Sequence, residues 1–131
     1  MGIIGEMVKK DSPIIEAIGT LDELQAVISV VRYQLSDIRL DGIIRDIGNI
    51  MSGKKTEVNL ETEIKKQEKK VKPVNKFVIF SDKKAVYLNW IRTIVRRAER
   101  RMVALKNKEA LEYLNKLSKY LYLLARKAEE K

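Results

Sequence analysis

The sequence predicts an all-α fold in which antiparallel helices pack as a bundle. The 131 residues include only six glycines and two prolines, a composition that favours helices over strands and hairpins. Apolar residues also recur at alternating spacings of three and four in several separate segments, as on one face of a helix. Each run covers two or three heptads, which indicates several bundled helices instead of one long coiled coil. We expect a single domain over residues 1–131, because 45% of the residues are hydrophobic and the chain is long enough for one core.

The first expected helix begins at Ser12 and Pro13. The serine hydroxyl can accept hydrogen bonds from free backbone N–H groups, and proline suits the first helical position. An apolar row follows over about six turns: Ile14, Ala17, Leu21, Leu24, Ile28, Val31 and Leu35. Beside it runs a second row of mostly small residues: Ile15, Gly19, Asp22, Ala26 and Ser29. Small side chains would let another backbone or a ligand come close to this face.

Two shorter helices are expected next. The first covers residues 41–51, and its apolar residues facing the core are Ile43, Ile44, Ile47, Ile50 and Met51. The second is weaker and begins at an imperfect capping box, Thr56 to Asn59. Its apolar residues are spread among many lysines: Val58, Leu60, Ile64 and Val71. We interpret KKQEKKVKPVNK, residues 65–76, as a solvated helix end that runs into a loop at Pro73; a polyanion-binding tail is disfavoured because the segment mixes charges.

The last two helices follow the short apolar stretch FVIF, residues 77–80, which is too short to be a helix alone. Ser81 and Asp82 can cap the next helix, which we expect to run to about Lys106. Its apolar row is Leu88, Ile91, Val95, Ala98, Met102 and Leu105. The final helix covers roughly residues 108–129, with the apolar row Ala110, Leu114, Leu117, Leu121, Leu124 and Ala128.

The composition restricts the possible chemistry. With no cysteine and no histidine, the chain has no disulfide, no thiolate metal site and no imidazole base, and we assign no residue as a metal ligand. The net charge of +9 favours polyanionic partners: nucleic acid, membrane headgroups or a phosphorylated small molecule. No apolar run reaches the roughly 18 residues of a membrane span, and no secretory signal is evident. We therefore expect a cytoplasmic protein with no membrane partner.

The stretch RTIVRRAERR, residues 92–101, places five arginines and one glutamate on the fourth expected helix. At about 100° per residue, Arg92, Arg96 and Glu99 lie on the flank of the apolar row, where a neighbouring helix or subunit would partly bury them. Arg97, Arg100 and Arg101 point elsewhere. Arg97 and Arg101 form a like-charge i,i+4 pair, which is unfavourable unless an anionic group lies nearby.

Asp22, on the small-residue row of the first helix, is a natural carboxylate partner for these arginines. Arginine suits bidentate contacts to carboxylate or phosphate. From the residues alone, three hypotheses stay open: ordinary surface salt bridges, a nucleic-acid surface and a pocket for a polyphosphate. The nucleic-acid hypothesis is the weaker one, because no exposed aromatic residues interleave with the arginines for base stacking.

Three stretches together resemble the PduO-type ATP:cob(I)alamin adenosyltransferases: DSPIIEAIGTLDEL at residues 11–24, RTIVRRAERRMVAL at 92–105 and LNKLSKYLYLLAR at 114–126. LETEI at residues 60–64 and FVIF at 77–80 also fall in the family's order. The resemblance implies a five-helix bundle that assembles as a homotrimer with active sites between subunits. It implies transfer of the 5′-deoxyadenosyl group of ATP to the cobalt of reduced cobalamin, with magnesium present and triphosphate released.

The same resemblance implies roles for particular residues. Arg96, Arg97 and Arg100 would hold the triphosphate, where cations stabilise charge on a leaving group. Asp22 would pair with Arg92 across the subunit boundary. The remaining assignments are Glu99 to orient neighbouring arginines, Lys10 to reach phosphate, Asn115 to contact the nucleotide, and Phe77 to keep the lower ligand of the corrinoid away from cobalt.

The sequence also departs from the family pattern. The family's Thr-Arg-Thr-Gly-Asp-like segment is expected to be missing, and GIIGEMVKKD carries Met7 where arginine is usual. The Pro-Gly-Gly turn after Phe77 is replaced, Asn89 stands where histidine is common, and Lys119 replaces a usual aspartate. These departures leave a second hypothesis, a non-catalytic trimer that binds nucleotide or corrinoid. A third, motivated by charge, is a helical bundle that associates with RNA or DNA.

Overall fold

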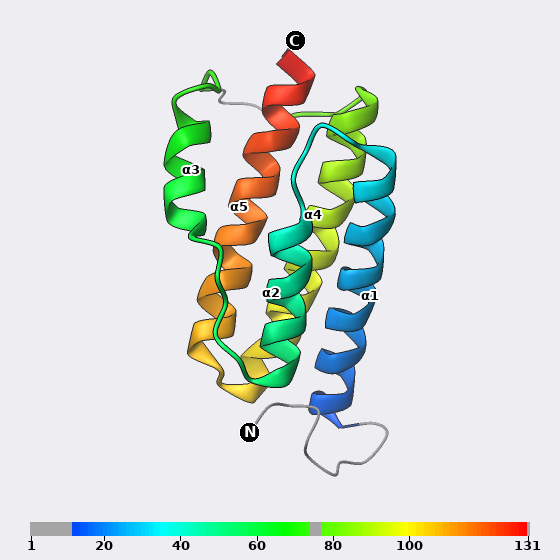
Figure 1. Cartoon of the computed structure of the whole chain (residues 1–131), viewed down its shortest axis with the longest axis vertical. Helices are drawn as coiled ribbons and strands as arrows, with labels where there is room; N and C mark the ends of the chain where they lie inside the picture. The colour runs from blue at the N-terminus through cyan, green and yellow to red at the C-terminus, as the bar shows by residue number, and fades with distance from the viewer. Residues whose placement is uncertain (1–11, 74–76, 131) are drawn as a thin grey trace.

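In a computed structural model of the protein, the described residues, 12–73 and 77–130, form five α-helices and one short 3₁₀ helix (Figure 1). The elements are α1 (Pro13–Gln34), α2 (Asp41–Ser52), α3 (Leu60–Glu68), α4 (Lys83–Met102), η2 (Val103–Leu105) and α5 (Lys108–Glu130). Neither described range contains a strand. The predicted all-α, five-helix fold is therefore confirmed.

Successive α-helices run in opposite directions, and α4 and α5 lie at the centre of the bundle (Figure 1). Helix α4 packs against α5 on one side and against α1 on the other, while α3 covers α5 and α2 covers α1. The buried apolar residues of the described chain form one core cluster. None of the helices that the structure describes is long and apolar enough to cross a bilayer. This arrangement places one flank of α4 toward α1 and the other toward α5.

The caps and apolar rows of α1 and α4 agree with the sequence prediction. The Ser12 hydroxyl accepts a hydrogen bond from the Ile15 amide at 3.2 Å. The Asp82 carboxylate accepts bonds from the amides of Lys84 and Ala85 at 3.1 and 3.4 Å. The residues behind these caps are buried at the predicted spacing, and those with 0% exposure include Leu21, Leu24, Leu88, Ile91 and Val95. Side-chain caps and one apolar face therefore define both helices.

Two helix ends differ from the prediction. The third helix does not begin at Thr56, because Asn59 caps it instead and accepts a hydrogen bond from the Thr62 amide at 3.1 Å. The fourth helix ends at Met102 and not at Lys106. A 3₁₀ turn follows, and Lys106 then adopts a left-handed φ of 55°, which terminates the helical path. Residues 74–76 of the predicted loop lie outside the described residues.

The segment between α2 and α3 is held by the buried carboxylate of Asp46. One oxygen accepts bonds from the Glu57 amide at 2.7 Å and the Asn49 side chain at 3.3 Å. The other accepts bonds from the Val58 amide at 2.9 Å and the Tyr113 hydroxyl of α5 at 2.8 Å. Burial and the neighbouring Asp46 carboxylate raise the pKa of Tyr113, so its hydroxyl stays protonated and donates. Asp46 thus joins α2, α5 and the connecting segment.

Candidate functional site

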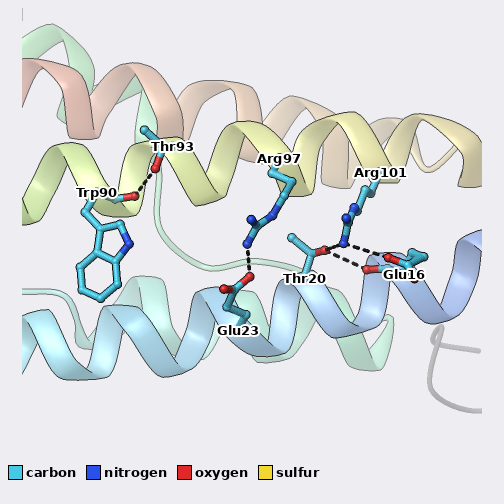
Figure 2. Close-up of polar contacts among 7 residues, drawn as sticks. All are labelled: Glu16, Thr20, Glu23, Trp90, Thr93, Arg97 and Arg101. Carbon is cyan, nitrogen blue, oxygen red and sulfur yellow. Dashed lines mark hydrogen bonds and ion pairs between the residues drawn. The ribbon is translucent and has the colours of Figure 1, made fainter.

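Two arginines on one flank of α4 pair with carboxylates of α1 (Figure 2). Arg97 forms an ion pair with Glu23. Arg101 lies 3.0 Å from the Glu16 carboxylate and donates to the Thr20 hydroxyl at 2.6 Å. These carboxylates supply the anionic groups that the like-charge pair of Arg97 and Arg101 requires. This flank of α4 therefore serves the packing of α4 against α1.

The expectation that Asp22 is the carboxylate partner of the arginines is wrong within one chain. Its neighbour Glu23 faces α4, and one residue along a helix turns the side chain by about 100°. Asp22 is exposed on the outward face of α1. Within residues 12–73 and 77–130, it makes no ion pair or hydrogen bond. Its carboxylate is therefore available to a group outside the described chain.

The opposite flank of α4 holds three of the predicted site residues together. Arg96 donates to Glu99 at 3.0 Å, and Asn115 of α5 donates to the other oxygen of the same carboxylate, also at 3.0 Å. The Glu99 side chain is 18% exposed and the Arg96 side chain is 50% exposed. Glu99 therefore orients the guanidinium of Arg96, while the Arg96 side chain as a whole stays half exposed.

Arg92, Arg96 and Arg100 recur at every fourth residue of α4, and we call them the outward arginine row. The Arg92 Nε donates to the Asn89 side-chain oxygen at 2.8 Å, so Asn89 positions the first member of the row. Arg100 is exposed and has no ion pair in the described part of the chain. Glu99 is thus the one carboxylate of residues 12–73 and 77–130 that pairs with the row. Three guanidinium groups with one carboxylate leave net positive charge at an accessible surface, which suits an anionic ligand.

Arg97 is placed differently from these three. Besides its ion pair with Glu23, its Nε is buried and has no hydrogen-bond partner among the described residues. A direct contact with a phosphate would therefore compete with the α1 carboxylate.

Phe77 lies at one end of the bundle, on the segment that precedes α4, and it is 90% exposed. A cavity of about 460 Å³ adjoins it, between this segment and the last turns of α5. The axial rise from Lys83 to Arg96 is about 20 Å at 1.5 Å per residue. One chain therefore does not bring Phe77 next to Arg96.

Two further expectations for the site concern Lys10 and the metal ion. Lys10 lies outside the described residues. In the ranges that the structure describes, no group of three or more carboxylates could hold a metal ion. Magnesium commonly binds through one or two carboxylates together with substrate phosphates.

Sequence reasoning did not single out Glu16, Thr20 and Glu23. These three residues are four and three positions apart, so they share one face of α1. Arg97 and Arg101 share a face of α4 in the same way. Matching these two faces would have predicted the α1–α4 ion pairs.

Comparisons with known proteins agree with this fold and identify its family. A family model described as cobalamin adenosyltransferase matches residues 2–128. The corrinoid adenosyltransferase of Bacillus subtilis is 34% identical over 95% of this chain and 79% of its own length. The corrinoid adenosyltransferase PduO of Salmonella typhimurium is 30% identical over 93% of this chain, which spans 44% of that protein.

The fold is also found among solved structures. One is a phenylalanine-to-alanine variant of the PduO-type ATP:corrinoid adenosyltransferase from Lactobacillus reuteri, complexed with cobalamin and ATP. Its TM-score is 0.74 at 25% sequence identity, and the match covers 98% of this chain and 87% of that one.

Proposed function

The chain belongs to the cobalamin adenosyltransferase family, and we propose that it transfers the 5′-deoxyadenosyl group of ATP to the cobalt of cob(I)alamin. In this reaction the reduced cobalt is a substrate and supplies the electron pair of the new cobalt–carbon bond. The carbon–oxygen bond to the triphosphate breaks, and the triphosphate leaves with that bond's electrons. The chemistry needs no protein nucleophile or base, which suits a chain without histidine or cysteine.

The outward arginine row is the observation that carries this proposal. Negative charge develops on the leaving triphosphate, and fixed cations stabilise it most when they need no rearrangement. Arg96 is already oriented by Glu99, which in turn is held by Asn115. We place Arg96 and Arg100 against the triphosphate. Arg97, which the resemblance also assigns to it, supports the row from the α1 side through its ion pair with Glu23.

We further propose that the partner of the chain is a second copy of itself in a homotrimer, with the active site between subunits. The contacts of Arg97 with Glu23 and of Arg101 with Thr20 define the antiparallel register of α1 and α4, and this register places Val30 level with Trp90. Both are about half exposed, at 49% and 45%. An apolar patch at this helix pair suits burial against another subunit.

Within such a trimer, Asp22 of one subunit would pair with Arg92 of the next. This contact would use the carboxylate that no residue of the described chain neutralises. An active site between subunits would place Phe77 of one subunit toward the arginine row of another. Magnesium would enter with the ATP phosphates. The cytoplasmic location and the single domain over residues 1–131 stay predictions.

The test supplies ATP, magnesium and chemically reduced cobalamin and follows the absorbance change on cobalt–carbon bond formation. Turnover with release of triphosphate is the expected result. Absence of turnover together with saturable ATP binding in calorimetry would instead support the non-catalytic nucleotide-binding trimer. Steeply salt-dependent binding to RNA or DNA that ATP does not affect would support the nucleic-acid hypothesis.

A further inference from the structure

The last turns of α5 hold the segment that carries Phe77. Near Lys72, the Arg126 guanidinium donates to the Lys72 carbonyl at 2.6 Å, and the Glu130 carboxylate accepts the Lys72 amide at 3.0 Å. At the other end, Glu129 accepts the amides of Ser81 and Asp82 at 2.7 and 3.0 Å. Glu129 also accepts the Ser81 hydroxyl at 3.0 Å. We call Arg126, Glu129 and Glu130 the α5 clamp.

The described residues between these two attachments alternate in exposure. Phe77 and Ile79 are 90% and 81% exposed, whereas Val78 and Phe80 are partly buried. The Phe80 ring packs edge-on against Tyr122 of α5, with centroids 6.1 Å apart. This inward contact fixes which faces of the segment turn outward. Phe77 and Ile79 are therefore presented on its solvent side.

The clamp is built from groups that resist displacement. The Arg126 side chain is 8% exposed, and its guanidinium lies 5.8 Å from the centre of the Tyr122 ring. Hydrogen bonds from the Asp82 and Ser81 amides lower the pKa of the Glu129 carboxyl, which therefore stays ionised at neutral pH and keeps accepting them. Charge-assisted bonds of this kind are stronger than neutral ones. Attachment of Ser81 and Asp82 to Glu129 leaves the neighbouring residues 77–80 less conformational freedom to lose on binding a ligand.

We propose that Glu129 and Arg126 are positioning residues that set the orientation of Phe77 toward the corrinoid, an inference that rests on the proposed function. Neither side chain belongs to the arginine row, and Arg96, at the centre of that row, is about 20 Å along α4 from Lys83, where α4 begins. Loss of the clamp should therefore weaken use of the corrinoid while leaving ATP binding intact. A purely structural role would reduce both.

The experiment compares Glu129→Ala with the wild-type protein under varied cobalamin and varied ATP. We expect the kcat/KM for cobalamin to fall about ten-fold, while the KM for ATP changes by less than about two-fold. Glu129→Gln keeps one oxygen that can accept both amides, so its kcat/KM for cobalamin should lie between those of the wild-type protein and Glu129→Ala. Glu112→Ala is the matched control, because Glu112 is an exposed carboxylate of the same helix with no ion pair in the described chain, and it should behave as wild type.

A double-mutant cycle separates positioning from general damage. If Glu129 acts through Phe77, adding Glu129→Ala to Phe77→Ala should cost less than about two-fold beyond Phe77→Ala alone. Fully additive losses, an equal rise in the KM for ATP, or no change in Glu129→Ala would each overturn the inference. The proposed function fails separately, if the wild-type protein shows no turnover. In that case, absorbance titration with cobalamin tests the inference, and weaker cobalamin binding by Glu129→Ala than by the wild-type protein would support it. Equal binding by the two proteins, or no binding by the wild-type protein, would overturn it.

Discussion

Glu99 accepts a hydrogen bond from Arg96 of its own helix and another from Asn115 of α5, each at 3.0 Å. The Glu99 carboxylate therefore connects α4 and α5 and contacts the accessible guanidinium of Arg96. Because one side of this guanidinium is held by Glu99, its remaining N–H donors point toward solvent in a fixed direction, which lowers the entropy lost when an anion binds.

Replacing Glu99 by Gln should loosen Arg96 without removing its charge. We expect the kcat/KM for ATP to fall by about ten-fold to a hundred-fold, since a misplaced catalytic contact commonly costs this much. The change in the free energy of unfolding should stay below about 1 kcal/mol, as for other partly exposed pairs. Steady-state kinetics and thermal unfolding measure the two effects. Glu109→Gln, an exposed carboxylate on α5, is the control, and equal losses in both variants would contradict the role of Glu99.

Arg96→Lys tests whether the planar fork of donors matters beyond charge. Lysine keeps the positive charge but loses bidentate geometry. We expect the KM for ATP to rise about ten-fold, measured by varying ATP at saturating cobalamin. Arg45→Lys, at an exposed arginine of α2, should leave the KM unchanged. A normal KM in Arg96→Lys would mean that charge alone suffices there.

Asp46→Ala should destabilise the fold strongly. The substitution leaves two backbone amides and the buried Tyr113 hydroxyl without their acceptor, and each unsatisfied donor costs about 1–3 kcal/mol. We expect a loss of at least about 3 kcal/mol in denaturant unfolding. Tyr113→Phe removes only one donor and should cost about 1 kcal/mol. The reverse order of the two losses would disagree with Asp46 as the shared acceptor.

The ion pair of Asp37 with Lys84 predicts a dependence of stability on pH. The hydrogen bond from Lys84 lowers the pKa of the Asp37 carboxyl below its ordinary value. A lowered pKa means that the stabilisation is present above about pH 4 and is lost as the pH falls through the folded-state pKa. The Tm difference between wild type and Asp37→Asn should therefore be constant from pH 7 to about pH 5 and shrink below about pH 4. A difference that grows on acidification would have the wrong sign.

Trp90→Lys tests the apolar patch on α1 and α4. A charge at a half-exposed site costs little in a free chain but disfavours burial against another subunit. We expect size-exclusion chromatography with light scattering to show a trimer for wild type and a smaller species for the variant. Val103→Lys, at a residue 59% exposed after the end of α4, serves as the matched substitution. An unchanged trimer in Trp90→Lys would remove this patch from the interface.

The sequence was informative where one local rule decided the outcome. Spacing predicted the buried faces of α1, α4 and α5, and the Ser12 and Asp82 caps followed from side-chain chemistry. The predicted start of α3 was wrong because Thr56 and Asn59 can both serve as the N-cap, and only packing selects between them. Asp46 was not singled out, because its partners come from residues 49, 57, 58 and 113. Hydrogen bonds between residues so far apart in the sequence leave no pattern in any short stretch of it.

The site was predictable to the same extent. Arg96 and Glu99 share a helix, so their contact follows from spacing, whereas the hydrogen bond to Asn115 depends on how α4 meets α5. The choice between Asp22 and Glu23 depends on a rotation of α1 that no residue pattern alone specified.

In the proposed trimer, the two neighbouring carboxylates Asp22 and Glu23 have different tasks. Arg97 neutralises the charge of Glu23 within the same subunit. The α1–α4 ion pair therefore forms in a single chain and does not depend on association with another. If Asp22 pairs with Arg92 of another subunit as proposed, a substitution of Asp22 changes assembly while the α1–α4 contact stays intact. Inserting one residue between Glu16 and Asp22 would turn the following helix by about 100°, and folding and association would fail together.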